Sequence, residues 1–161
     1  MKIQNGTLPW TKSCFVCGEN NPHGLHLRSR IESNKVMIEH VIREADAGYD
    51  RILHGGIAAT LLDEVMTWAS IVASRKVFVA AEIAVRFLGP VFVGEKICAE
   101  GWVTKTGTRL CLTEGTIKNQ DEKILVAATG KFMPMNIDQA KHVQEDFVIN
   151  SEAIHPKEIT S

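Results

Sequence analysis

The sequence lacks several features that would assign it to a functional class at once. Its 18 basic and 19 acidic residues leave a net charge of −1, so it offers no electrostatic attraction for nucleic acid or for an anionic membrane. Its first ten residues, MKIQNGTLPW, contain one lysine and no apolar segment, so no signal peptide is expected. Internal repeats, low-complexity tracts and linkers are also absent. These absences favour one cytoplasmic domain over residues 1–161 that binds neither nucleic acid nor a membrane.

Cysteine is scarce, and in a protein that is not exported it is expected as reduced thiol or metal ligand. Cys98 and Cys111 fall inside predicted strands, where they are expected to be small buried hydrophobes. Four residues of the types that bind zinc lie close together near the N-terminus: Cys14, Cys17, His23 and His26. Zinc sites usually place a longer stretch between their ligand pairs. Free thiols in a loop are therefore favoured, zinc and a disulfide are the alternatives, and no metal is assigned to the functional site.

One long helix is predicted over residues 54–74, HGGIAATLLDEVMTWASIVAS. Apolar residues lie nearly all round it, which is typical of a buried helix. The segment is long enough to span a membrane, but the adjacent Asp63 and Glu64 near its middle make that costly. Its polar residues fall on one stripe: Thr60, Asp63, Thr67, Ser70 and Ser74. A carboxylate on a buried helix needs a functional or structural reason.

Two predicted strands precede this helix and four follow it. Residues 27–41 are typical of two strands joined by a turn at Ser33-Asn34. The later strands are predicted over residues 76–88, 92–104, 109–119 and 123–133, and their short connections indicate an antiparallel meander. A curled sheet covers one side of an apolar helix, so the other side is expected to meet a partner subunit. A short helix over residues 137–147 and a frayed tail from Asn150 complete the prediction.

Element order and motif together resemble the hotdog fold and, within it, the PaaI-like branch of the thioesterase superfamily. The resemblance is carried by His54-Gly55-Gly56, by Asp63-Glu64, and by the strand AEIAVRFLGPVFVGEKI of residues 81–97. The segment CFVCGENNPHGLHL, residues 14–27, also looks like one that recurs in this branch. The likeness covers a core of about residues 14–134, with the cysteine loop and the C-terminal tail peripheral. It implies an α+β protein, an antiparallel sheet of about six strands wrapped around one central helix.

The resemblance also implies hydrolysis of acyl-CoA thioesters by a homodimer or a dimer of dimers, with no cofactor besides the CoA of the substrate. Such hydrolysis needs a donor for the oxyanion and a nucleophile or a base for water. The first N–H groups of a helix lack acceptors, and Gly55 lets a carbonyl approach them closely. Asp63 is the candidate nucleophile or base. The two residues are about 12 Å apart along a helix, so the site is expected to combine Gly55 of one subunit with Asp63 of its partner.

Other roles for these residues remain possible. Glu64 lies roughly 100° round the helix from Asp63 and is the rival acid, because a related branch uses a glutamate on this helix. Asp63 can also be a structural acid that is hydrogen-bonded to Thr60 or Thr67. His54 is expected to orient the start of the helix, with contact to substrate as the alternative.

Two positions depart from the family pattern. The family often has Asn or Gln about six residues before the histidine, where this chain has Gly48, and Ser or Thr early in the next strand, where it has Ala80-Ala81. Gly56, Thr67 and Arg86 complete the candidate substrate contacts, with Arg86 a candidate for the phosphates of CoA. Because the Asn or Gln and the Ser or Thr of the family pattern are missing at these positions, a non-catalytic acyl-CoA-binding protein is one alternative. An enoyl-thioester hydratase or dehydratase is the other.

Overall fold

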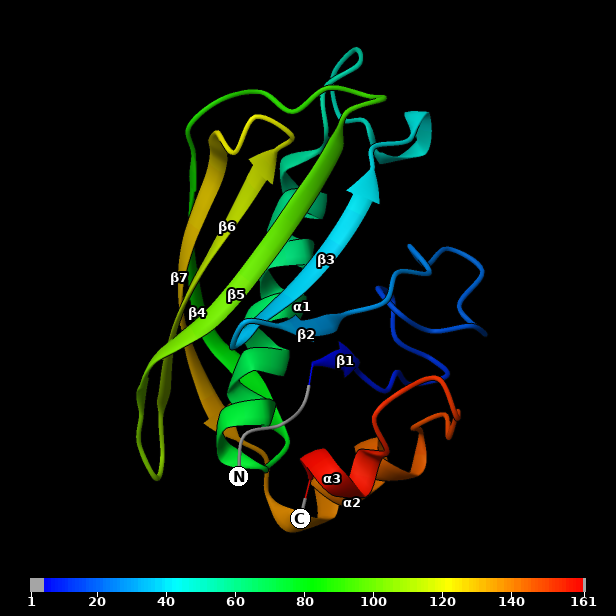
Figure 1. The fold of residues 1–161 in the computed structure, drawn as a ribbon, viewed down its shortest axis with the longest axis vertical. Coiled ribbons are helices and arrows are strands. Elements are labelled where there is room, and N and C mark those ends of the chain that lie inside the picture. The colour runs from blue at the N-terminus through cyan, green and yellow to red at the C-terminus, as the bar shows by residue number, and fades with distance from the viewer. Residues whose placement is uncertain (1–4, 161) are drawn as a thin grey trace.

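A computed structural model describes residues 5–160 and shows one antiparallel sheet curled around one long helix (Figure 1). The helix, α1, spans Gly55–Ser74 and packs against five of the strands. The strands are β1 (Gly6–Thr7), β2 (Arg30–Glu32), β3 (Lys35–Val41), β4 (Phe78–Phe87), β5 (Lys96–Thr106), β6 (Cys111–Asn119) and β7 (Ile124–Pro134). The remaining elements are a 3-10 turn over Glu44–Asp46 and two short helices, α2 (Ile137–Glu145) and α3 (Pro156–Ile159).

The strand order, β1-β2-β3-β5-β6-β7-β4, differs in one place from the predicted meander. Strands β5, β6 and β7 do follow one another as antiparallel neighbours, but β4 pairs with β7 at the far edge of the sheet. The reason is that residues 88–95 do not form a tight turn. They cross the N-terminal end of α1 (Figure 1) and are held there by hydrogen bonds from Leu53 N–H to the Val91 carbonyl and from Val93 N–H to the Arg51 carbonyl.

Local sequence explains where the central elements turn, begin and end. Ser33 and Asn34 both have positive φ, 51° and 65°, which gives the predicted β2–β3 hairpin the two-residue turn that suits twisted strands. The His54 side chain caps α1, and Arg75 ends it in the left-handed conformation with its N–H bonded to the Ile71 carbonyl. On β5, a Cβ at Gly101 would lie 2.7 Å from the Val65 backbone, so glycine permits the close approach of sheet and helix.

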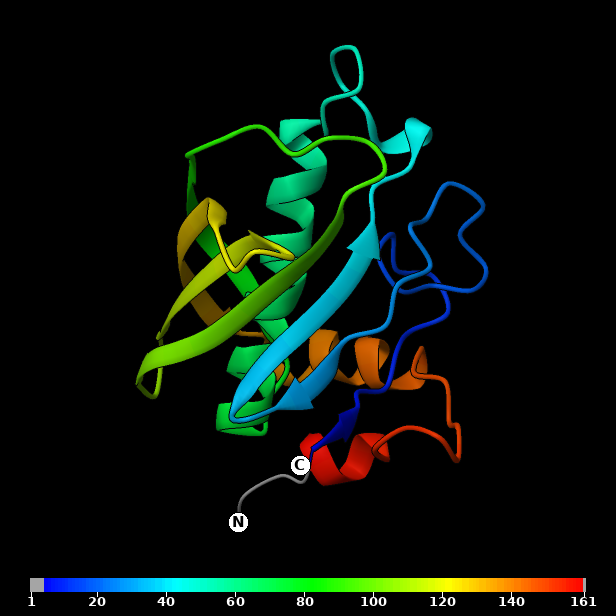
Figure 2. The same cartoon turned by 45° about the horizontal axis from the view of Figure 1, so that its top comes forward.

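The N- and C-terminal segments cover the side of α1 that the sheet leaves open (Figure 2). Leu8, Trp10, Phe147 and Ile159 are buried with the core, and the Phe147 ring lies 5.9 Å from that of Trp68. The predicted frayed tail is therefore wrong for the described residues, because apolar side chains from it pack into the core. Segments that were expected to be peripheral therefore cover part of the side of α1 that was expected to meet a partner subunit, while Asp63 on that helix remains half-buried.

Helix α1 also has the length and mean hydropathy of a membrane-spanning helix, 1.3 over its most apolar window. Half of that window is buried inside the fold. The core helix of a globular domain has the same length and composition, so these properties follow from its place inside the sheet.

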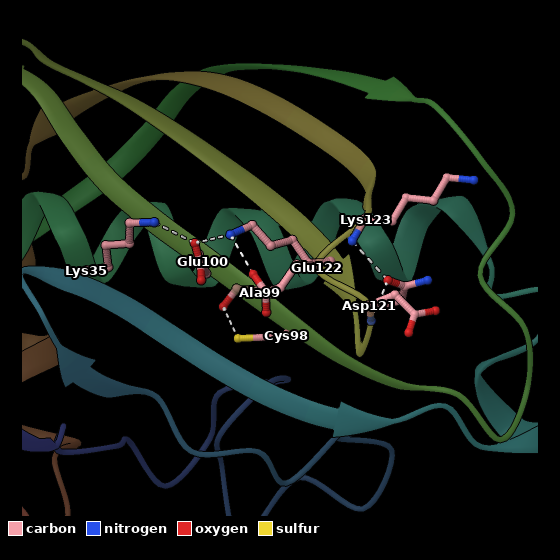
Figure 3. A network of polar contacts seen from close by, with 9 residues as sticks. Lys35, Cys98, Ala99, Glu100, Asp121, Glu122 and Lys123 are labelled. Atoms are coloured by element: carbon pink, nitrogen blue, oxygen red, sulfur yellow. Dashed lines mark hydrogen bonds and ion pairs between the residues drawn. The ribbon is translucent and has the colours of Figure 1, made fainter.

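The outer face of the sheet, away from α1, carries a closed cluster of ion pairs (Figure 3). The Glu100 carboxylate on β5 lies 2.7 Å from the Lys35 ammonium and 3.3 Å from that of Lys118, which also contacts Glu122 at 3.3 Å. The Lys35 ammonium stacks over the Trp102 ring, 4.8 Å from its centroid. Each charge has an opposite partner, so this cluster fastens β3, β5 and β6 together and offers no free group for chemistry.

Candidate active site

The first turn of α1 presents one free backbone donor. The Gly56 N–H donates to His54 Nδ1 at 2.9 Å, and the N–H groups of Ile57 and Ala58 donate to the His54 carbonyl. Within residues 5–160, the Gly55 N–H has no acceptor. An unpaired N–H at the positive end of a helix is suited to bind an oxyanion. His54 thus has the orienting position that was predicted for it.

A buried carboxylate fixes the loop that leads into this turn. The Asp46 side chain, 1% exposed, accepts from the Arg43 backbone N–H at 2.9 Å and from its guanidinium at 2.7 Å, and it lies 2.7 Å from His40 Nε2. Its backbone carbonyl accepts the His54 N–H. Burial alone would raise the pKa of Asp46, but the hydrogen bonds from Arg43 and His40 outweigh it and lower the pKa to about 2. Sequence reasoning assigned no role to this residue.

A pocket of about 440 Å³ opens at the Gly55 end of the helix. Gly55 and Ala58 line it from α1, Tyr49 from the preceding loop, and Phe87 and Val91 from the β4 end and the crossing segment. A Cβ at position 55 would lie 3.2 Å from Phe87 Cζ, so the glycine leaves room beside its own N–H. The walls are mainly apolar, as in pockets that bind small molecules. Sequence reasoning missed the wall residue Tyr49, which is 85% exposed and whose sequence signal is an aromatic ring in a polar loop.

The two adjacent acids of α1 have different surroundings. Asp63 is half-buried, accepts a hydrogen bond from the Thr67 hydroxyl at 3.3 Å, and has its pKa raised by burial. Thr60, the other predicted partner, donates to the Gly56 carbonyl. Glu64 faces the N-terminal segment, where its carboxylate accepts from Trp68 Nε1 at 3.0 Å. Burial and the neighbouring Cys14 raise the pKa of Glu64 to about 8. Neither acid lines the pocket beside Gly55 of its own chain.

The positions that depart from the family pattern lie before and after α1 in the chain. Gly48 packs against His54, and a Cβ there would lie 3.1 Å from His54 Cδ2. Ala80 and Ala81 lie early in β4, at an irregularity in its pairing with β7; Ala80 is half-buried and Ala81 is exposed. None of the three supplies a side-chain donor.

Arg86 does not reach the Gly55 pocket within one chain. It lines a separate hollow of about 220 Å³, together with Trp102 and Glu114. Its neighbour Phe87 lines the Gly55 pocket, because successive side chains of a strand point to opposite faces. The structure therefore separates Arg86 from the other candidate substrate contacts.

The four cysteines are free thiols in this structure. Cys111 is fully buried, as predicted, whereas Cys98 is half-buried. His23 and His26 are exposed and do not gather with the N-terminal pair. The side chain that lies beside Cys14 and Cys17 is instead Glu64, which is far from them in sequence. Sequence reasoning did not connect Glu64 with the two cysteines.

Comparisons with known proteins agree with this architecture. The family model of the thioesterase superfamily matches residues 51–126. Human acyl-coenzyme A thioesterase 13 is 30% identical over 111 residues, which cover 68% of this chain and 71% of that protein. The structure of the Escherichia coli PaaI protein from the phenylacetic acid degradation operon superposes with a TM-score of 0.61 at 22% identity, over 68% of this chain and 78% of that one.

A hypothetical thioesterase from Streptococcus pneumoniae, solved with coenzyme A, superposes with a TM-score of 0.59 at 18% identity, over 63% of this chain and 78% of that one. The sheet wrapped around α1 is thus a hotdog fold, which confirms the predicted fold class with seven strands in place of about six. The chain belongs to the thioesterase superfamily.

Proposed function

We propose that this protein hydrolyses acyl-CoA thioesters to CoA and a carboxylic acid. The observation that carries the proposal is the unpaired Gly55 N–H beside an apolar pocket of about 440 Å³. A thioester carbonyl in this pocket would accept the Gly55 hydrogen bond, which strengthens as negative charge develops on the oxygen. The relationship to human acyl-coenzyme A thioesterase 13 and the coenzyme A in the pneumococcal structure support the choice of substrate.

The catalytic acid would come from a second copy of the chain. Because α1 is continuous from Gly55 to Ser74, Gly55 and Asp63 are about 12 Å apart along its axis, and one carbonyl cannot contact both. Strand β4 lies at the edge of the sheet and exposes Val79 and Phe87. A long apolar edge strand favours pairing with another chain. A homodimer joined there, alone or within a dimer of dimers, supplies the second subunit.

Asp63 is the acid we assign to the reaction, as nucleophile or as base. As a base it would take a proton from water while the water oxygen attacks the carbonyl carbon; the carbon–sulfur bond then breaks and the CoA thiolate leaves. Glu64 is less suited because its carboxylate faces Trp68 and Cys14 of its own chain. The scheme needs no cofactor beyond the CoA of the substrate, and we propose the cytoplasm as its compartment.

A non-catalytic acyl-CoA-binding protein is the second candidate. It is favoured by Gly48, Ala80 and Ala81, which offer no side chain to polarise a thioester or to hold a water. A hydratase or dehydratase has less support, since such enzymes pair a histidine with an acid. His54 Nδ1 accepts the Gly56 N–H, and no carboxylate among residues 5–160 contacts the His54 ring.

The test is turnover of a panel of short-chain, medium-chain and aromatic acyl-CoAs. Free CoA should be quantified by chromatography, because the protein's own thiols would react with a thiol reagent. Turnover that disappears in Asp63→Asn supports hydrolysis at the assigned site. Saturable stabilisation by acyl-CoA without CoA release would favour the binding protein. If no member of the panel is hydrolysed and none stabilises the protein, both candidates are contradicted.

A further inference from the structure

The N-terminal cysteine pair sits in a rigid turn, residues 14–18, that places two sulfurs together. Cys14 Sγ accepts hydrogen bonds from the backbone N–H of Val16 at 3.3 Å and of Cys17 at 3.4 Å. The Gly18 N–H closes the turn on the Cys14 carbonyl at 2.8 Å, and a Cβ at Gly18 would lie 2.4 Å from that oxygen. Backbone donors aimed at a sulfur favour its thiolate form.

The third member of this cluster, Glu64, comes from the middle of α1. Its Oε2 lies 4.0 Å from Cys14 Sγ, and ligand atoms of Glu64, Cys14 and Cys17 all lie within 4.8 Å of one another. Trp68 donates to the other carboxylate oxygen. Among residues 5–160, no lysine, arginine or histidine forms an ion pair with Glu64. A carboxylate that is largely removed from water without a cation is costly to ionise.

We propose that Cys14, Cys17 and Glu64 together bind one Zn²⁺ ion. Two thiolates and a carboxylate suit zinc, whereas Mg²⁺ and Ca²⁺ prefer oxygen ligands throughout. Zinc bonds of about 2.3 Å to sulfur and about 2.0 Å to oxygen place tetrahedral ligands roughly 3.5–3.8 Å apart. The observed separations, 4.0 Å between Cys14 Sγ and Glu64 Oε2 and at most 4.8 Å within the cluster, need a contraction of up to about 1.3 Å, which small rotations of the three side chains would supply. A water molecule would complete the tetrahedron.

Such an ion would join the N-terminal loop to the central helix one residue away from Asp63. The loop is already fastened from its other side, by hydrogen bonds from Leu25 N–H to the Phe15 carbonyl and from Arg28 to the Cys17 carbonyl. The role assigned to the ion is structural, because Gly55 and its pocket are at the end of α1 and include none of these ligands. The zinc site does not depend on whether the chain hydrolyses thioesters.

The test is metal binding by the full-length protein, purified under reducing conditions and freed of metal with a chelator. We expect Co²⁺ to bind at one equivalent with a sulfur-to-cobalt charge-transfer band, and Zn²⁺ to displace it. Cys14→Ser and Cys17→Ser should weaken this band and lower Zn²⁺ affinity by more than about tenfold, since loss of outer partners alone costs 10–100-fold. Glu64→Gln should lower the affinity to a similar degree while the band remains.

Cys98→Ser is the matched control, because Cys98 lies on the outer face of β5 with its thiol near the Ala99 carbonyl. It should bind metal as the wild type does. The proposal would be overturned if reduced wild-type protein bound no Co²⁺ through sulfur, or if both N-terminal serine variants bound as tightly as the control. Should a serine variant fail to fold, the wild-type cobalt spectrum and the Glu64→Gln affinity still decide.

Discussion

Asp63 and Glu64 are adjacent in sequence, but the two sides of α1 that carry them differ in burial and in hydrogen-bond partners. Asp63 has one weak internal partner, the Thr67 hydroxyl at 3.3 Å, and remains half exposed. Glu64 is covered by the N-terminal segment and lies against the Trp68 indole and the Cys14 thiol. One helix therefore presents one acid toward solvent or a second subunit and the other toward its own chain.

The difference follows from helical geometry and from which segments cover each side. A rotation of roughly 100° between successive residues directs the two carboxylates to different neighbours. The terminal segments cover the Glu64 side, through Phe147 against the Trp68 ring and Cys14 against the Glu64 carboxylate. An acid that reacts with substrate must be reachable, whereas an enclosed acid needs a hydrogen-bond donor or a cation. The comparison assigns chemistry to Asp63 and a structural role to Glu64.

The largest expected effect comes from exchanging each acid for its amide. Asp63→Asn should lower kcat by about 10³-fold, within the range for loss of a general base. Glu64→Gln should stay within about tenfold of wild type, because its carboxylate faces away from the pocket. Steady-state kinetics on the best acyl-CoA would measure both, with circular dichroism and size-exclusion chromatography to show that fold and assembly persist. The reverse pattern would move the catalytic role to Glu64.

The next largest effect should come from removing the free N–H of the helix. Gly55 is the first residue of α1 after the cap, where proline is tolerated because this N–H has no intrahelical acceptor. The extended conformation of His54 also suits a following proline. Gly55→Pro should therefore lower kcat by about 10²-fold, as the loss of an oxyanion donor does, with little change in helicity.

Gly55→Ala is the matched control, since it adds a Cβ near Phe87 but keeps the N–H. It should lose less activity than the proline variant. Equal losses in the two variants would mean that crowding against Phe87 limits the reaction, and the Gly55 N–H would lose its assigned role.

The buried Asp46 gives a pH dependence with a definite sign. Its pKa falls from 3.8 to about 2 on folding, so its stabilisation of about 2 kcal/mol is present above about pH 4 and is lost as the pH falls from 4 to 2. Urea unfolding at pH 7, 4 and 2.5 should show wild type exceeding Asp46→Asn at the higher two values, with the gap closing at the lowest. A gap that stays constant with pH would contradict this account.

The central helix, the β2–β3 hairpin and the His54 cap were predictable because their signals are local: apolar residues round a 20-residue segment, a Ser-Asn pair, and a histidine before two glycines. The β4–β7 pairing was not, since the edge that a strand joins depends on the path of residues 88–95 over the helix. The Cys14–Glu64 contact joins residues 50 positions apart. No spacing rule connects them, whereas His23 and His26 are nearby in sequence but are exposed and lie outside the cluster.

The hydrogen bonds that the two acids accept inside the chain should contribute unequally, and the one from Thr67 should give the smallest effect of all. Trp68→Phe removes the indole donor and leaves Glu64 Oε1 without its partner, which should lower the free energy of unfolding by about 1–3 kcal/mol. Thr67→Val removes the hydroxyl that donates a hydrogen bond to Asp63 at 3.3 Å. This substitution should change the free energy of unfolding by no more than about 0.5 kcal/mol, because water can replace that bond. Urea denaturation of both variants with a chelator present measures the difference. Equal losses would mean that the Asp63 carboxylate is held as firmly by its own chain as that of Glu64, and it would then be a structural acid.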